Sequence, residues 1–278
     1  MDDDYIYNRK SVNEMITFSK LGRYGNLGNQ LFQVAFISHF AAKYHLRYEL
    51  PEWEYAGYFD YAFNISAQVD CPNDLIISEP SLAYNEEYFL QFLPQMEKDK
   101  VDIEGYFQSY LYFSKAHVLE IFKTGNKFHP VSIERDNSVA ISVRRGDFVD
   151  HPLYNNIEAG TFLDVLKKFK GFKVYVFSDD FTYCKAHFIG RQFEFMEGLS
   201  GIEQLITMSS FDYFVLSNST FSYWGAMLSP QPKQVYFPYY MYPNIEMCNL
   251  YNRFYWPRDN DVYRAYINPI NKRITTRF

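Results

Sequence analysis

The sequence has little cysteine, no long apolar run and no concentrated positive charge. Its 278 residues include three cysteines, Cys71, Cys184 and Cys248. They are far apart and form no Cys-x-x-Cys pair, so the sequence predicts neither a disulfide framework nor a structural zinc site. This cysteine usage fits a reducing compartment.

No stretch is apolar over the length that a membrane-spanning helix needs, and residues 1–20 lack a signal-peptide pattern. We therefore expect a soluble, cytoplasmic protein. The tail Asn271–Arg277 carries three cationic residues, which keeps peripheral contact with the inner membrane as an alternative. The net charge of −6 argues against a nucleic-acid partner, since such proteins present a clustered basic face.

Aromatic residues are abundant at 20%, with 26 Tyr and 27 Phe. A tyrosine combines an apolar ring with a polar tip, so an excess of tyrosine is typical of surfaces that pack on sugars, bases or partner proteins. The hydrophobic fraction of 47% indicates an ordinary globular core, and the length indicates one large or two compact domains.

The second half of the chain alternates regularly between apolar runs and amphipathic stretches. This alternation predicts a parallel sheet with right-handed crossovers and helices on both faces. The expected strands are Val139–Val143, Lys173–Phe177, Gln192–Phe195, Tyr213–Leu216 and Gln234–Phe237. The expected helices are Ala159–Lys170, Phe181–Phe188, Gly201–Ser210 and one that opens within Ser219–Leu228.

The first half is less regular. A short strand is expected at Ile16–Gly22, an apolar helix within Gly22–His45, short helices and loops over Leu46–Asp102, and a helix at Tyr110–Phe122. The polar stretch Lys123–Asn137 predicts the boundary between two domains, 16–135 and 136–278.

Two adjacent arginines, Arg144 and Arg145, follow the buried strand Val139–Val143. A guanidinium is a rigid fork of donors suited to phosphate or carboxylate oxygens. Ligands of open α/β sheets bind just beyond the carboxyl ends of the strands. The pattern therefore indicates an anion site, although a surface ion pair with Asp147 would explain it equally well.

A glycine-rich loop precedes the first helix, with Gly22, Gly25 and Gly28 followed by Asn29 and Gln30. Such a loop lets backbone amides approach a ligand, and the helix N-terminus favours anions. It is not a Walker loop, because no Gly-Lys-Ser/Thr follows. Asn29 and Gln30 are suited to bind a sugar or phosphate, and the alternative is that Asn29 caps the helix.

Two further polar clusters follow strands of the second half. Asp179 and Asp180 are suited to accept hydrogen bonds from a base edge or a ribose, and the alternative is that they cap the next helix. The run Ser217–Ser229 places several hydroxyl groups at a strand-to-helix turn. Capping needs only one of them, so this run indicates an anion cradle.

Three motifs, in this order, resemble those of α-1,2-fucosyltransferases of glycosyltransferase family 11. They are YGNLGNQLFQ at Tyr24–Gln33, SVRRGDF at Ser142–Phe148 and SNSTFSYWGA at Ser217–Ala226. The stretch Phe177–Asp180 is also similar to a strand end of that family. Together the motifs are specific, and the resemblance spans residues 21–230.

The resemblance implies a GT-B-type α/β fold of two Rossmann-like halves. An acceptor-side domain with the glycine-rich loop would occupy 16–135, and a GDP-sugar-binding domain 136–278. The implied reaction is the inverting transfer of L-fucose from GDP-fucose to the 2-hydroxyl of a galactose-terminated oligosaccharide or lipid-linked glycan, in bacterial polysaccharide synthesis or protein glycosylation. No metal and no cofactor are implied. The alternatives are another GDP-sugar donor or a non-catalytic binding relative.

The resemblance also implies roles for individual residues. Arg144 would bind the diphosphate beside Arg145, and Asp179 or Asp180 would hold guanine or ribose. Asp147 and Asp150 are the candidates for the general base because they follow the arginines closely in sequence, and His151 is a weaker candidate. The other expected donor contacts are Gly28, Asn29, Gln30, Ser217, Asn218, Ser219, Thr220, Phe221 and Ser222.

Three positions depart from the family pattern: Ser142 replaces a histidine, Phe148 a tyrosine and Tyr223 a tryptophan. A serine replaces one hydrogen bond of a histidine but not its charge, so lower activity or an altered donor choice is expected. Asp259-Asn260-Asp261 has the form of a metal-binding Asp-x-Asp, but its setting beside Pro257 predicts a turn.

Overall fold

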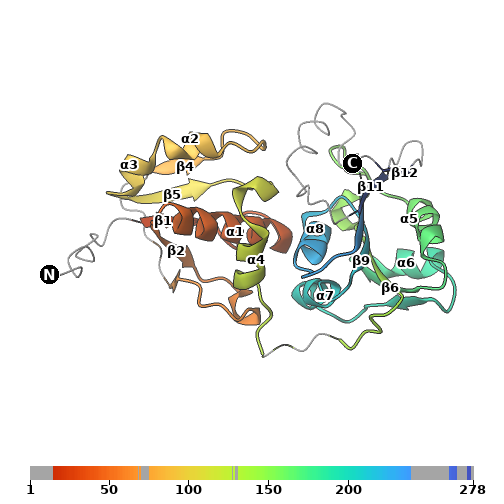
Figure 1. The fold of residues 1–278 in the computed structure, drawn as a ribbon. Helices are drawn as coiled ribbons and strands as arrows, with labels where there is room; N and C mark the ends of the chain where they lie inside the picture. The colour runs from red at the N-terminus through yellow and green to blue at the C-terminus, as the bar shows by residue number, and fades with distance from the viewer. Residues whose placement is uncertain are drawn as a thin grey trace.

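The computed structural model describes residues 15–67, 69, 75–126, 128 and 131–238, together with the backbone at 263–267 and 274–276. These residues form two lobes, each built on a mainly parallel sheet (Figure 1). The predicted turn at Asp259–Asp261 and most of the cationic tail lie outside the described residues. Within those ranges no helix has the length and apolar character needed to cross a bilayer.

The first lobe holds a five-stranded parallel sheet in the order β3-β2-β1-β5-β4. The prediction of irregular structure over 46–102 is wrong, because four of these strands lie there. They are short and partly polar, and they become strands by pairing: Ile16 of β1 lies between Tyr48 of β2 and Val101 of β5. The strands are β1 (Met15–Thr17), β2 (Arg47–Pro51), β3 (Ile65–Ser66), β4 (Ile76–Ser78) and β5 (Lys100–Glu104).

Helix α1 (Leu27–Lys43) is buried along most of its length and forms the core of the first lobe. The predicted helix at 110–122 is instead a short 3-10 turn (Tyr110–Tyr112) and α4 (Lys115–Ile121). Ser114 interrupts the pair by capping α4, with its hydroxyl accepting from the backbone N–H of His117 at 3.2 Å. Two short helices, α2 (Glu86–Leu90) and α3 (Leu93–Met96), cover the outer strands.

The second lobe holds a seven-stranded sheet in the order β12-β11-β10-β9-β6-β7-β8. The five predicted strands are confirmed as β6 (Ser138–Val143), β7 (Lys173–Ser178), β8 (Phe193–Phe195), β9 (Tyr213–Leu216) and β10 (Gln234–Pro238). Two were not anticipated: β11 (Tyr263–Ile267) extends the sheet by pairing with β10, and β12 (Ile274–Thr276) runs antiparallel to β11. Strand β12 is the edge strand and β11 lies next to it, and pairing rather than an apolar pattern selects both.

Helices cover both faces of this sheet, as predicted. Figure 1 shows α7 (Gly201–Met208) and α8 (Thr220–Met227) on the face toward the first lobe. The opposite face carries α5 (Ala159–Leu166) and α6 (Phe181–His187). The predicted boundary near 135 falls in the stretch between α4 and β6, which crosses from one lobe to the other.

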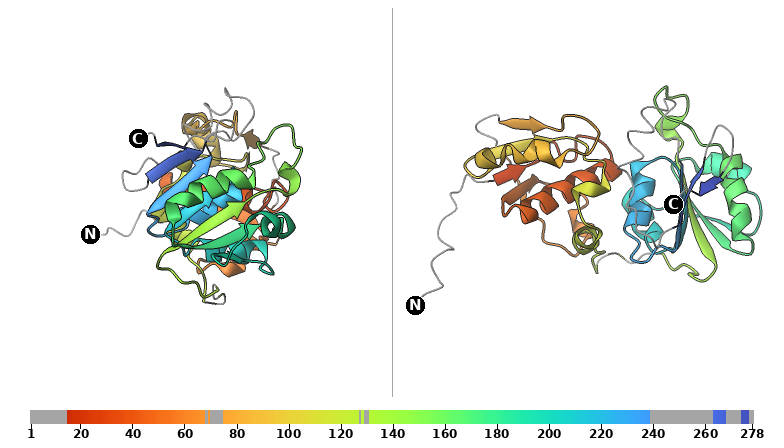
Figure 2. Two further views of the ribbon diagram at one scale, coloured as in Figure 1. Left: turned by 90° about the vertical axis from the view of Figure 1, so that its right-hand side faces the viewer. Right: turned by 45° about the horizontal axis from the view of Figure 1, so that its top comes forward.

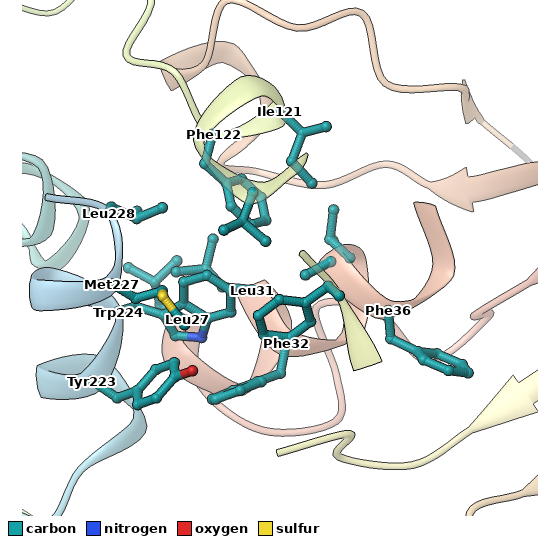
Figure 3. Packing of buried hydrophobic residues seen from close by; sticks show 14 of the residues in the cluster. Leu27, Leu31, Phe32, Phe36, Ile121, Phe122, Tyr223, Trp224, Met227 and Leu228 are labelled. Atoms are coloured by element: carbon teal, nitrogen blue, oxygen red, sulfur yellow. The ribbon is translucent and has the colours of Figure 1, made fainter. Parts of the chain in front are cut away.

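The lobes meet where α1 packs against α8 (Figures 1 and 2). Phe32 of α1 lies 4.9 Å, between ring centroids, from both Tyr223 and Trp224 of α8. Phe113 stacks on Trp224 at 5.4 Å. Leu27, Leu31, Met227 and Leu228 complete this contact (Figure 3). One apolar cluster therefore spans both lobes and holds the first turns of α1 and α8 together.

A half-buried histidine on α4 makes the stability of the first lobe sensitive to pH. Ser38 donates its hydroxyl proton to the carbonyl of Val34 at 2.7 Å, so its 2.9 Å contact with His117 requires that Nε2 of the imidazole be the donor. Burial lowers the pKa of His117 to about 4, and the nearby His39 also lowers it. The folded state therefore disfavours the charged imidazole.

We expect His117→Gln to flatten the pH dependence of stability. As the pH falls below about 6.5, the unfolded chain takes up this proton before the folded one. The contribution of His117 is therefore full above that pH and is lost progressively toward pH about 4. Urea unfolding between about pH 7.5 and about pH 5 measures the difference from wild type. If the free energies of unfolding of the variant and of wild type differ by the same amount at both pH values, the role assigned to His117 is wrong.

Candidate active site

The three polar clusters of the second half meet at one edge of the sheet. Strand β6 lies between β7 and β9, with Val143 opposite Ser178 and Ser142 opposite Leu216. The residues that follow these strands therefore leave the sheet side by side. The arginine pair, the aspartate pair and the serine-rich turn therefore lie close together, and their role as one binding site stays a prediction.

Arg144 is a fixed but accessible cation. Its guanidinium forms an ion pair with Asp147, and its Nη1 lies 2.7 Å from Oδ2 of Asp179. It also lies over the ring of Phe148, 5.4 Å from the centroid. The side chain is 25% exposed, and that of Asp147 60%. The predicted ion pair with Asp147 and an accessible anion site are thus both compatible with this geometry.

The side chain of Arg145 is mostly buried within the second lobe. Its guanidinium carbon lies 3.5 Å from the ring centroid of Tyr183, and its Nε donates to Oδ2 of Asp180 at 3.3 Å. Its Nη1 lies 4.0 Å from Glu158 and is buried without a hydrogen bond to any described residue. The side chain is only 13% exposed. Of the two arginines, Arg144 is therefore the one that a ligand reaches more easily.

The two aspartates have different partners. Asp180 caps α6, with Oδ1 accepting from the backbone N–H of Tyr183 at 2.9 Å, which confirms the capping alternative for this residue. Asp179 accepts from the backbone N–H of Arg145 at 2.8 Å and pairs with Arg144. A side chain at Gly146 would meet the Asp179 carboxylate, which would have to shift. Asp179 therefore links the loop after β7 to the loop after β6.

Most of the serine-rich turn is bonded within the protein. Ser219 caps α8 by accepting from the N–H of Phe221 at 3.2 Å. Ser222 bonds to Ser217 at 2.8 Å in the buried interior. Asn218 donates to the carbonyl of Asn155 at 2.9 Å. Of the six predicted contacts in Ser217–Ser222, only Thr220 and Phe221 are partly exposed.

Ser142, which stands where the family has a histidine, lies in the interior. It is 4% exposed, and its hydroxyl is 2.7 Å from that of Ser222. Ser142, Ser222 and Ser217 thus form a buried chain of hydroxyl groups between β6 and the start of α8.

We expect Ser142→His to destabilise the fold by about 1–3 kcal/mol without raising activity, because an imidazole overpacks this site. Ser142→Ala is the matched control and should cost about 1 kcal/mol through the lost hydrogen bond. Urea unfolding and initial transfer rates measure both. A histidine variant that is as stable as wild type and more active would show that the site accepts the family residue.

The glycine-rich loop ends, and α1 begins, at an earlier residue than predicted. The helix begins at Leu27, and Asn26 rather than Asn29 occupies the capping position. The alternative that Asn29 caps the helix is therefore wrong. Because Gly25 adopts a left-handed φ of +91°, the chain turns two residues before the helix begins.

The amide side chains after this turn hold loops of the first lobe. Asn29 accepts from Nε2 of Gln108 at 2.9 Å. Gln30 donates to the carbonyl of Gly25 and accepts from Nε1 of Trp53, both at 2.9 Å, and is 4% exposed. These bonds position the loop, and Asn29 is the more accessible of the two predicted ligand contacts.

Gly28 brings the two lobes into backbone contact. A Cβ atom there would lie 2.5 Å from the backbone nitrogen of Phe221 and 2.6 Å from the carbonyl carbon of Thr220. The first turn of α1 therefore rests directly on the first turn of α8. The structure thus joins the glycine-rich motif to the serine-rich motif.

The two candidate bases differ in their partners and in their exposure. Asp147 contacts Arg144, whereas Asp150 is exposed, has a left-handed φ of 60° and forms no ion pair with a described residue.

Tyr183 and Glu158 were missed from the sequence, although Tyr183 follows Asp180 at helical spacing. Its hydroxyl donates to Glu158 at 2.7 Å, and together they enclose Arg145.

Two mainly parallel α/β lobes that meet where α1 packs against α8 give this chain a fold of the GT-B type. Solved fucosyltransferases share this fold. FUT1 from Arabidopsis thaliana, solved as a mutant with GDP, superposes with a TM-score of 0.53 at 11% identity, covering 86% of this chain and 72% of that one. The α-1,6-fucosyltransferase NodZ, soaked with GDP-fucose, gives 0.50 at 10% identity, covering 78% and 92%.

The family model of glycosyl transferase family 11 matches residues 85–254, more than half of the chain, and the chain belongs to that family. The glycine-rich stretch at 24–33 precedes the matched range. An α-1,2-colitosyltransferase from Escherichia coli is 26% identical over 257 residues, which cover 73% of this chain and 85% of the relative.

Proposed function

We propose that the protein transfers L-fucose, or a closely related deoxyhexose, from its GDP-sugar to the 2-hydroxyl of a galactose-terminated glycan, with inversion and without a metal ion. The observation that carries the proposal is Arg144, held by Asp147 and Asp179 at the edge of the sheet and still 25% exposed. Membership of family 11 and the α-1,2-colitosyltransferase relative support the reaction class.

The chemistry requires stabilisation of the leaving group. Breaking the bond between sugar and phosphate leaves negative charge on GDP, which a fixed cation and aligned backbone dipoles stabilise. Arg144 supplies the cation. The N-terminus of α8, with Thr220 and Phe221 at the accessible edge, supplies the dipole. Gly28 lies against this turn and brings the first lobe to the same point.

The acceptor hydroxyl must lose a proton as it attacks the anomeric carbon. Asp147 is the preferred base, because its carboxylate is 60% exposed beside Arg144. A bound diphosphate offers Arg144 new oxygens in place of Asp147, and this exchange frees the carboxylate to accept the proton. Asp150 is the second candidate. Asp180 caps α6 and accepts from Arg145, so Asp179 is the preferred aspartate for ribose or guanine.

Two donor sugars fit the relatives, fucose and colitose. Colitose is fucose without its 3-hydroxyl, so the two donors differ by one group. The identity of 26% to a colitosyltransferase favours testing both. The implied cellular roles, in polysaccharide synthesis or protein glycosylation, and the place at the inner membrane belong to this proposal as well.

The test is to incubate the protein with GDP-fucose, GDP-colitose or GDP-mannose and p-nitrophenyl β-D-galactopyranoside, with and without EDTA. We expect an α-1,2-linked product whose formation EDTA does not affect. Product from GDP-mannose alone would overturn the deoxyhexose assignment, and loss of transfer in EDTA would overturn the metal-free mechanism. Calorimetric binding of GDP without turnover of any donor would identify a non-catalytic relative.

A further inference from the structure

Two tyrosines stack at the carboxyl edge of the first sheet. The loops after the neighbouring strands β1 and β5 carry Tyr24 and Tyr106, whose rings lie 4.7 Å apart at 18°. Both side chains are partly exposed. Burial raises the pKa of Tyr24, and the neighbouring Tyr106 raises it further. The pair is thus a flat aromatic surface outside the core.

Hydrogen bonds from Gln33 and Glu79 fix the loops that carry this pair. Gln33 of α1 is fully buried, and its amide donates to the carbonyl of Tyr24 at 2.8 Å and to that of Gly105 at 3.3 Å. The carboxylate of Glu79 accepts from the N–H groups of Tyr106 and Phe107 at 2.9 and 3.0 Å. Phe107 has a left-handed φ of 51°, a conformation that persists where its surroundings enforce it. The orientation of the pair is therefore preorganised.

The second lobe brings a third tyrosine to the same place. Tyr154 stacks on Phe148 at 4.3 Å and 5°, and Arg144 lies over Phe148. Burial raises the pKa of Tyr154, and the nearby Tyr106 and Asp147 raise it further. Tyr154 therefore lies beside the arginine loop of the second lobe, close enough to Tyr106 for the two side chains to interact electrostatically.

The surroundings of the pair suit a sugar. A pyranose has an apolar face of C–H groups and a rim of hydroxyls, and a partly exposed tyrosine offers a flat ring with a polar tip. Lys20 and Glu104 form an ion pair at 2.7 Å beside Tyr24 and add donors and acceptors for hydroxyl groups. No residue of this group is among those expected to bind the donor.

We propose that Tyr24, Tyr106 and Tyr154 form the binding site for the terminal hexopyranose of the acceptor, with Tyr106 as its central ring. The inference rests on the proposed function, because it assumes a glycan acceptor. It places the acceptor sugar between the Lys20–Glu104 pair and Asp147, the preferred base. The site accordingly selects the acceptor and leaves GDP binding unaffected.

The test measures acceptor and donor binding separately in Tyr106→Ala and Tyr106→Phe. The probe is p-nitrophenyl β-D-galactopyranoside. We expect Tyr106→Ala to raise the KM for this galactoside about tenfold or more, with the Kd for GDP unchanged. Tyr106→Phe keeps the ring and should stay within about threefold of wild type. Tyr88→Ala, which removes a partly buried tyrosine that packs against Phe89 and Phe92, is the matched control.

An unchanged KM for the galactoside in a folded Tyr106→Ala would overturn the inference, and so would an equal loss of GDP affinity. If Tyr106→Ala does not fold, Tyr106→Leu keeps the apolar volume and removes the flat ring. Saturation-transfer NMR of the galactoside with wild type and Tyr106→Leu then reads acceptor binding without any donor. Failure of the proposed function would appear differently, as wild-type protein that neither binds GDP nor turns over any donor.

Discussion

Arg144→Ala is expected to abolish sugar transfer while the fold survives. The side chain is the accessible cation of the site, and the leaving GDP needs fixed positive charge. Removal of one such stabilising group lowers turnover by about 100- to 1,000-fold. Stability should change little, because the Arg144 side chain is 25% exposed and its ion pairs lie near the surface. Initial rates measure turnover, urea unfolding measures stability, and calorimetry with GDP measures nucleotide affinity.

Arg191→Ala is the control for loss of one positive charge in the same lobe, since Arg191 is exposed in the turn between α6 and β8. It should leave turnover and GDP affinity unchanged. Arg145→Ala should instead lower stability, because it removes a mostly buried guanidinium from the ring of Tyr183 and from Asp180. Near-normal turnover in Arg144→Ala would refute the role that we assign to this arginine.

Gly28→Ala should separate the lobes at the point where the site is assembled. The new methyl group would meet the backbone of Thr220 and Phe221 at 2.5–2.6 Å, and a helix backbone cannot yield as a side chain does. Overpacking of this kind costs about 1–3 kcal/mol. Because a displacement of about 1 Å between reacting groups lowers rates about 100-fold, transfer should fall by at least that factor.

Gly57→Ala is the matched control, because a Cβ at this exposed glycine meets nothing within 4 Å. Urea unfolding and transfer rates should be close to wild type for Gly57→Ala and reduced for Gly28→Ala. A Gly28→Ala protein with both properties intact would show that the close contact between α1 and α8 is not required.

Most of the five strands from β6 to β10 could be predicted because they are buried apolar runs that end in polar residues. Val139–Val143 and Lys173–Phe177 show this pattern, and the structure extends each by a single residue. Parallel strands end at one edge, so the position of Arg144, Asp179 and Ser217 near one another followed from the order of elements alone. These features depend on local composition and on topology.

The first lobe could not be predicted in the same way. Strand β2, RYELP, is polar and mostly partly exposed, and β3 is two residues long. Such segments carry no apolar alternation, and they become strands because β2 pairs with β1, and β3 in turn pairs with β2. Strands β11 and β12 at the other end of the chain follow the same principle.

The sequence by itself determined which chemical groups gather at the edge of the second sheet, and its motifs indicated the family. It could not assign their partners. Asn29 and Gln30 bind loops of the first lobe, and Ser217 and Ser222 bind each other in the interior. Arg144 stays accessible while Arg145 is enclosed by Tyr183 and Asp180. Only the tertiary structure decided these roles, because hydrogen-bond partners and burial depend on residues that are distant in the chain.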